Sequence, residues 1–166
     1  ALLQHVVYVN GIRGKSTVTR MIAAGLKSGG WSVFCKTTGT VPRLIGTDGV
    51  ERPLRRRGKA NIREQARVMR MAVREHAQVL VIECMAVDPF LQEISQRKIV
   101  RSDIGVITNV RLDHTEEMGL TLEEICDSLS RTIPEHGILY TADTQFWGQM
   151  VRNAEKVGAR VELSRP

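Results

Sequence analysis

The chain has 166 residues, of which 42% are hydrophobic and 25% are charged. These are ordinary values for one globular domain, and they exclude a chain that is disordered, collagen-like or coiled coil throughout. No apolar run is long enough to span a membrane and no signal-peptide pattern opens the chain, so we expect a soluble intracellular protein. The net charge is +6, but 3 Phe, 2 Trp and 2 Tyr offer little stacking surface, so no nucleic-acid partner is expected.

Short apolar runs alternate along the chain with segments of helical period. Strands are predicted at residues 5–9, 31–36, 79–83, 104–108, 137–140 and 160–163, and helices at 15–28, 61–77, 88–98, 121–132 and 144–157. This alternation predicts an α/β fold with a mostly parallel sheet and flanking helices. Asp48-Gly49 predicts a small inserted β-hairpin after the second strand, and Thr121 with Glu124 predicts a helix capping box.

The three cysteines, Cys35, Cys84 and Cys126, are an odd number and lie far apart in the sequence. Neither a disulfide framework nor a paired zinc site has that spacing. We therefore expect three buried free thiols.

A glycine-rich segment joins the first predicted strand to the first predicted helix. Gly11 and Gly14 allow the tight curl that lets several backbone N–H groups point at a phosphate, next to the positive end of a helix. Lys15 would neutralise the β and γ phosphates, and the Ser16 hydroxyl would bind Mg²⁺. The predicted nucleotide-binding residues here are Asn10, Gly11, Ile12, Arg13, Gly14, Lys15, Ser16 and Thr17. The alternative is a tight strand-to-helix connection, because the common phosphate-loop pattern has a glycine where this chain has Val9.

Polar residues follow two further predicted strands. In a parallel α/β sheet, ligands bind at the carboxyl ends of the strands. Glu83 ends the apolar run 79–83 and is a candidate Mg²⁺ ligand, or else a strand-end carboxylate facing solvent. Asn109 follows the next strand, and Asp113 and His114 come shortly after it. A histidine beside an acid can bind a metal or be held in one tautomer, although such a pair is often only part of a loop.

These three segments together resemble the ATP-dependent Mur ligase superfamily, which includes the folylpolyglutamate synthases. Those enzymes share a Gly-Thr-Asn-Gly-Lys-Thr loop and an Asn-x-x-x-Asp-His element, and Asn109, Asp113 and His114 match the second element residue for residue. Within the superfamily, the segments at residues 10–17 and 108–119 are most similar to the ligases that make bacterial poly-γ-glutamate, a capsule polymer. The resemblance runs over nearly the whole chain and implies the central, phosphate-loop ATP-binding domain of such a ligase.

The resemblance implies ATP and Mg²⁺ as cofactors and an acyl-phosphate route to an amide bond between glutamates. Lys15, Glu83 and His114 are then the catalytic candidates, and Asn109 joins the nucleotide-binding set. The metal candidates are Ser16, Thr38, Glu83 and His114, with Thr40 beside them in a Thr-Thr-Gly-Thr segment that could equally be an ordinary polar turn. The implied partners are glutamate, poly-γ-glutamate and other subunits of a synthase at the cytoplasmic side of the bacterial membrane, with homo-oligomers also possible.

The chain also departs from the superfamily pattern. Many Mur ligases carry a carbamylated lysine one helix after the Asp-His element, but the helix predicted at 121–132 contains no lysine, which leaves a second metal open. Arg13 stands where the Mur loop has asparagine. Ligases of this kind are longer and are preceded by a membrane segment, so we expect residues 1–166 to be one ATP-binding domain in the N-terminal part of a longer ligase, inactive alone. A nucleotide switch that binds nucleic acid and a catalytically silent assembly subunit are the alternatives.

Arginines recur along the helix predicted at residues 61–77. They stand at positions 63, 67, 70 and 74, which places them along one face, next to an apolar stripe of Ile62, Ala66, Met69 and Val73. Arg55, Arg56, Arg57 and Lys59 precede them. Such a face is either only solvated or in contact with something acidic, a partner subunit or the polyanionic polymer.

Overall fold

The computed structural model describes residues 3–39, 41–56 and 60–164. The strands are β1 (His5–Asn10), β2 (Val33–Thr37), β3 (Arg43–Ile45), β4 (Glu51–Pro53), β5 (Val79–Glu83), β6 (Ile104–Ile107), β7 (Ile138–Thr141) and β8 (Arg160–Leu163). The helices are α1 (Lys15–Ser28), α2 (Arg63–Arg74), α3 (Pro89–Ile94), α4 (Thr115–Met118), α5 (Leu122–Leu129) and α6 (Trp147–Glu155). A π-helical turn, η1 (Ser95–Val100), continues α3, and a 3₁₀ turn, η2 (Ser130–Thr132), continues α5.

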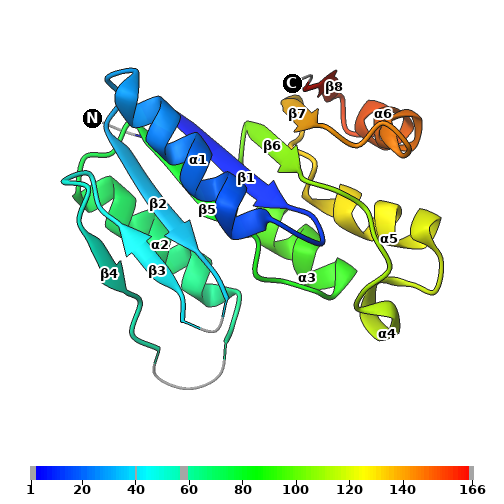
Figure 1. The fold of residues 1–166 in the computed structure, drawn as a ribbon, viewed down its shortest axis with the longest axis horizontal. Coiled ribbons are helices and arrows are strands. Elements are labelled where there is room, and N and C mark those ends of the chain that lie inside the picture. Colours follow the sequence, from blue (N-terminus) through cyan, green and yellow to red (C-terminus); the bar gives the residue numbers. More distant parts are fainter. Residues whose placement is uncertain (1–2, 40, 57–59, 165–166) are drawn as a thin grey trace.

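The described strands form one sheet in the order β4-β3-β2-β5-β1-β6-β7-β8 (Figure 1). All neighbouring strands are parallel except β3, which runs antiparallel to both β2 and β4. The predicted mostly parallel α/β fold with an inserted hairpin is therefore confirmed. Because β1, β5 and β2 are parallel and adjacent, their carboxyl ends lie side by side at one edge of the sheet.

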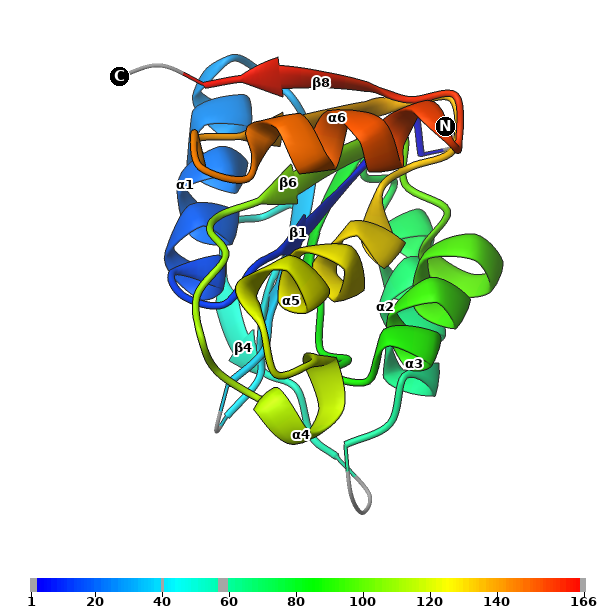
Figure 2. The same ribbon diagram turned by 90° about the vertical axis from the view of Figure 1, so that its right-hand side faces the viewer.

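Alternate residues of the central strands pack into two different cores, as the period of a strand requires. On one face, Val7, Val9 and Val81 pack under α1. On the other face, Tyr8, Leu80 and Ile82 pack in the core that α2 shares. Figures 1 and 2 show α1 on one side of the sheet and α2, α3 and α5 on the other. The two-sided burial explains why these strands read as continuous apolar runs.

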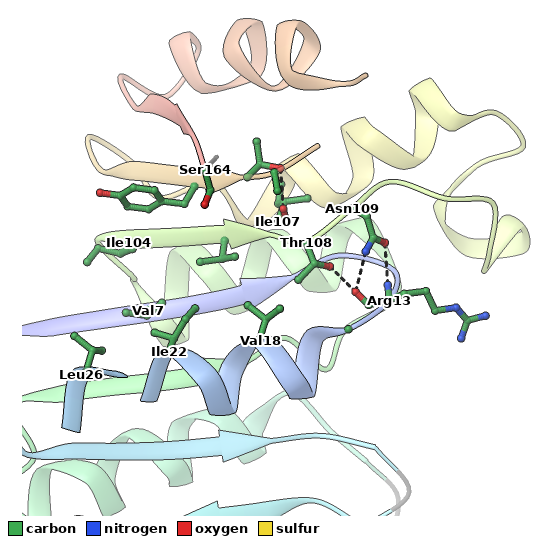
Figure 3. Close-up of a pocket in the computed structure, with 15 residues that line it drawn as sticks. Val7, Arg13, Val18, Ile22, Leu26, Ile104, Ile107, Thr108, Asn109 and Ser164 are labelled. Carbon is green, nitrogen blue, oxygen red and sulfur yellow. Dashed lines mark hydrogen bonds between the residues drawn. The ribbon is translucent and has the colours of Figure 1, made fainter. Parts of the chain in front are cut away.

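Part of the α1 face of the sheet is open. An apolar groove of about 580 Å³ runs between Val18, Ile22 and Leu26 of α1 and the exposed faces of β6 and β7 (Figure 3). Its polar end lies at Arg13 and Gly14, within the loop between β1 and α1.

The predicted capping box and thiols are confirmed. The Thr121 side chain accepts a hydrogen bond from the backbone N–H of Glu124, and the Glu124 side chain accepts one from that of Thr121. Cys35, Cys84 and Cys126 are free and buried. The short helix α4 was not predicted from the sequence, because four residues are too few to show a helical period. No helix in the described part of the chain is long and apolar enough to cross a membrane.

The predicted packing stripe of α2 is confirmed in part. Ile62 and Met69 are half-buried and pack against the core, but the fully buried face is shifted by one position. The helix buries Gln65, Val68 and Ala72, whereas Val73 is 41% exposed. Gln65 is fully buried because its side-chain amide bonds to Lys36 and to the Glu83 carbonyl, so a polar residue occupies the face that the sequence assigns to apolar ones. The four arginines of the helix are all exposed, as predicted. Thr40, Arg57 and Lys59 lie outside the described residues.

Candidate active site

The loop between β1 and α1 has the backbone of an anion-binding turn. Gly11 has φ +126°, and a Cβ on it would lie 2.0 Å from the Thr108 hydroxyl oxygen, so only glycine fits. Gly14 caps α1 in the left-handed conformation, without a side-chain cap and with no acidic residue in the first helical turn. The first N–H groups of a helix of this kind attract anions. Thr17 lies exposed in that same first turn.

Two predicted nucleotide residues turn their side chains into the protein instead. Asn10 donates from Nδ2 to Gln92 Oε1 at 2.8 Å and to Thr132 Oγ1 at 3.2 Å, and its Oδ1 accepts from the Gly11 N–H at 2.8 Å. Ile12 is 6% exposed and packs in the core that contains α5. These two side chains anchor the loop. Backbone hydrogen bonds add to this, because the Ile12 N–H donates to the Asn109 carbonyl at 3.3 Å and the Asn10 carbonyl accepts the Thr108 N–H at 3.0 Å.

The far end of the loop is held by residues that follow β6. Asn109 accepts the Arg13 N–H through Oδ1 and donates to the Arg13 carbonyl through Nδ2, both at 3.0 Å (Figure 3). Thr108 Oγ1 donates to the same carbonyl at 2.7 Å. Both the oxygen and the nitrogen of the Asn109 amide therefore bond to the backbone of the loop. In this structure, the Asn109 side chain positions the loop. Sequence reasoning missed Thr108, which it took as the last residue of a strand.

Lys15, Ser16 and Glu83 come together as predicted. Lys15 Nζ donates to the Gly11 carbonyl at 2.8 Å, which folds the ammonium back over the loop. Ser16 Oγ donates to Glu83 Oε2 at 2.8 Å, and the Thr38 N–H donates to the same oxygen at 2.7 Å. Glu83 is only 3% exposed, so the alternative of a carboxylate facing solvent is excluded. A buried acid that holds the hydroxyl next to the lysine is placed to bind a cation beside a phosphate.

The Asn-x-x-x-Asp-His element ends next to the same loop. Asp113 pairs with Arg13 at 2.9 Å, and its Oδ1 accepts the His114 N–H at 2.8 Å. That hydrogen bond is the largest cause that lowers the pKa of Asp113 below its ordinary value. The charges of His114, Arg13 and Lys15 lower it further. His114 adopts a left-handed backbone (φ +49°), a conformation that His76, Arg101 and His136 share away from this loop.

A pocket of about 340 Å³ has Lys15, Thr38 and His114 on its wall, whereas Ser16 and Glu83 do not line it. It is lined by Asn10, Lys15, Thr38, Gly39, Arg56, Ala60, Cys84, Met85, Ala86, Val87, His114 and Met118. Among the described residues, none of those lining it is acidic. Behind the Arg56 wall lie Glu64 and the fully buried Lys36, whose Nζ is 3.1 Å from Glu64 Oε1. Burial lowers the pKa of Lys36, and the charge of Glu64 opposes that shift.

The Ser16 and Glu83 oxygens suit a Mg²⁺ ion that is also bound by a nucleotide. No group of three or more His, Cys, Asp or Glu side chains that could hold a metal occurs within the described ranges. The Ser16 hydroxyl and the Glu83 carboxylate are nevertheless hard oxygen donors 2.8 Å apart. Mg²⁺ usually takes one or two protein oxygens and completes its shell with phosphate and water. These residues therefore fit a metal that arrives with a nucleotide.

Residues 9–162 match the Mur ligase middle domain, and the chain belongs to the Mur ligase family. It is 42% identical over 158 residues to the capsule biosynthesis protein CapB of Bacillus anthracis, covering 93% of this chain and 34% of that protein. It is also 42% identical over 160 residues to the PGA synthase CapB of Bacillus subtilis (strain 168), covering 95% of this chain and 41% of that protein. The chain thus spans 34% and 41% of the length of these two relatives.

Solved structures share the fold at lower identity. E. coli FolC in complex with ADP superposes with a TM-score of 0.75 at 18% identity, over 97% of this chain and 43% of that one. A bifunctional folylpolyglutamate synthase/dihydrofolate synthase with Mn, AMPPNP and L-glutamate bound gives 0.67 at 16% identity, over 97% and 43%. These likenesses confirm the predicted Mur ligase middle-domain fold.

Proposed function

We propose that this chain is the ATP-binding domain of a longer ligase that joins glutamates into γ-linked polyglutamate. The observation that carries the proposal is the Ser16–Glu83 hydrogen bond beside Lys15, because it joins a phosphate-binding loop to a buried metal-binding acid. The 42% identity to the PGA synthase CapB of Bacillus subtilis supports the polymer as product. The nucleotide and manganese in the FolC-like structures support ATP with Mg²⁺ as cofactors.

In the proposed reaction, a glutamyl carboxylate attacks the γ phosphorus of ATP, ADP leaves, and the acyl phosphate is then displaced by an incoming amino group. Lys15 neutralises charge that builds on the phosphoryl oxygens. Ser16 and Glu83 would hold Mg²⁺, which supplies Lewis-acid polarisation of the phosphate. Asn109 and Thr108 keep the loop in shape through the Arg13 backbone. His114 and Thr38, on the wall of the same pocket, orient groups around the transferring phosphate.

The same proposal places the full-length ligase at the cytoplasmic side of the bacterial membrane, with other synthase subunits. Glutamate and the growing polymer are its substrates. The L-glutamate bound in a folylpolyglutamate synthase of the same fold supports an acidic substrate. The alternative function, a nucleotide switch that binds nucleic acid, is less well supported because it assigns no role to the Asp113-His114 element.

ATP turnover separates the ligase from that switch. We expect the full-length ligase to release ADP faster when glutamate is added and not when DNA is added, and we expect the 166-residue chain alone not to respond to glutamate. Lys15→Ala should reduce nucleotide affinity at least about tenfold, since it removes a charged phosphate contact, without changing the thermal transition. Stimulation by DNA, or no response of the full-length ligase to glutamate, would contradict the ligase function.

The exposed arginine face of α2 is a candidate contact for the polymer. Arg63, Arg67, Arg70 and Arg74 are exposed and form no ion pair with any described residue. Guanidinium groups pair well with carboxylates, and exposed pairs are screened by salt. We expect poly-γ-glutamate to bind the chain at low ionic strength and to dissociate as salt approaches about 1 M.

Replacement of all four arginines of α2 by glutamine should remove the binding of poly-γ-glutamate. Glutamine at Arg152 and Arg160, exposed arginines of α6 and β8, is the control and should leave it nearly unchanged. Equal and salt-independent binding by all three proteins would eliminate the α2 face as the polymer contact.

A further inference from the structure

A line of three charged side chains runs from the core to the wall of the pocket. Lys36, on β2, is fully buried and lies 3.1 Å from Glu64 Oε1. Glu64, at the start of α2, accepts from Arg56 Nε at 2.6 Å and from Arg56 Nη2 at 3.2 Å. Arg56 lines the pocket together with Lys15 and His114. Two cations therefore share one carboxylate, and the outer cation faces the pocket.

Such a line needs an explanation, because burying a lysine is unfavourable. An apolar residue at position 36 would pack in the sheet without that cost. The lysine does hold Glu64 in place, with Gln65 Oε1 as its second acceptor at 3.2 Å. Glu64 in turn fixes the Arg56 guanidinium by two of its nitrogens. The result is a pre-oriented arginine whose Nη1 donates to no described residue.

The order of the strands places this arginine relative to the phosphate loop. β5 lies between β1, which leads into the loop, and β2, which carries Lys36. In register, Lys36 of β2 lies beside Ile82 of β5, which lies beside Tyr8 of β1. Neighbouring strands are about 4.8 Å apart, so Lys36 and β1 are about 10 Å apart. Lys15 and Arg56 line the same pocket, so a nucleotide phosphate on Lys15 would leave Arg56 available to a second anionic group there.

We propose that Arg56, held by Glu64 and Lys36, binds a carboxylate of the glutamyl substrate in this pocket. The proposal rests on the proposed function, because it assigns the substrate side of the same site. A carboxylate fits since the free edge of the guanidinium presents two N–H groups, and the fork geometry of arginine matches a carboxylate. The absence of any acidic side chain among the described lining residues leaves the Arg56 edge open to an anion.

Titration of the chain with a γ-linked tetraglutamate, in the presence of AMPPNP and Mg²⁺, tests the assignment. We expect Arg56→Gln to bind the tetraglutamate at least about tenfold more weakly than the parent while AMPPNP affinity stays unchanged. Arg152→Gln is the control: it removes the same charge from an exposed side chain on α6 that does not line the pocket, and it should bind as the parent does. Arg56→Lys should recover only part of the affinity, because lysine keeps the charge and lacks the fork.

Four outcomes would overturn the assignment. The first is unchanged tetraglutamate binding by Arg56→Gln, and the second is equal loss in the Arg152→Gln control. The third is loss of AMPPNP affinity in Arg56→Gln with tetraglutamate binding intact, which would assign the arginine to a phosphate. The fourth is a parent chain that binds AMPPNP but no tetraglutamate. A parent that binds no AMPPNP would instead contradict the proposed function itself, so the two failures are distinguishable.

Discussion

Glu83→Ala is expected to lower turnover of the full-length ligase by at least about 100-fold, the size of effect typical of a lost group that stabilises charge in a transition state. Glu83 is buried and binds Ser16 Oγ, so its loss removes the protein carboxylate at the proposed metal position. Because metal positioning acts mainly on the transition state, nucleotide affinity should change much less than turnover. His114→Ala should show the same pattern.

Rapid-quench measurement of acyl-phosphate formation, alongside nucleotide titration, is the readout for these variants. Glu83→Gln is the conservative control, since its amide oxygen can still accept the Ser16 and Thr38 hydrogen bonds while the charge is lost. A low rate in both Glu83 variants, with thermal transitions close to that of the parent, would assign the effect to the charge. Near-normal turnover in the alanine variants would return Glu83 and His114 to purely structural roles.

Glu64→Gln is expected to reduce the free energy of unfolding by about 3 kcal/mol, because breaking a buried ion pair leaves an uncompensated charge. The charge left behind is that of Lys36, which is fully buried. Burial raises the pKa of Glu64, but hydrogen bonds and charges from Arg56 and Lys36 outweigh it and hold the pKa below the ordinary value of 4.5. The stabilisation is therefore complete above that pH and is lost as the pH falls through the lowered pKa of the folded state.

Urea unfolding at neutral pH and at pH values below the ordinary glutamate pKa measures both effects. The matched control is Glu51→Gln, since Glu51 pairs with Arg20 and Arg43 through side chains that are 39 to 42% exposed. Surface pairs of this kind contribute less than about 1 kcal/mol. Adding Lys36→Met to Glu64→Gln should recover part of the loss. Equal small losses in Glu64→Gln and Glu51→Gln would show that the Lys36–Glu64 pair is not a buried ion pair in solution.

Much of the site could be predicted because it depends on strand ends. Lys15, Ser16 and Glu83 each follow or end an apolar run, and parallel strands bring such residues to one edge of the sheet. The role of Gly11 and Gly14 could also be predicted, because a tight turn between a strand and a helix requires residues without a side chain. The direct contact between Ser16 and Glu83, 67 positions apart, was not predicted: the strand-end position made Glu83 a candidate, and only the family resemblance joined it to Ser16.

The remaining parts depend on side-chain direction, which the sequence does not show. Asn10 looks like a ligand-facing polar residue, but its amide points to Gln92 and Thr132. Lys36 looks like the polar end of a strand, but α2 covers it with Glu64 and Gln65. A signal was available for the second case: a charged residue inside an otherwise apolar run needs a partner of opposite charge. The sequence offered several candidate acids and no reason to choose among them.

A crystal structure of the chain with AMPPNP and Mg²⁺ is the most direct test of the phosphate-binding loop. We expect the β and γ phosphates on the loop at residues 11–17, bound by the backbone N–H groups of residues 14–17, since those of residues 11–13 already donate to Asn10 and Asn109. We also expect Lys15 Nζ released from the Gly11 carbonyl to a phosphate oxygen, and Mg²⁺ in contact with Ser16 Oγ and next to Glu83. Phosphates bound elsewhere, with the Lys15 and Ser16 contacts unchanged from the nucleotide-free structure, would contradict the central claim that this loop binds the nucleotide.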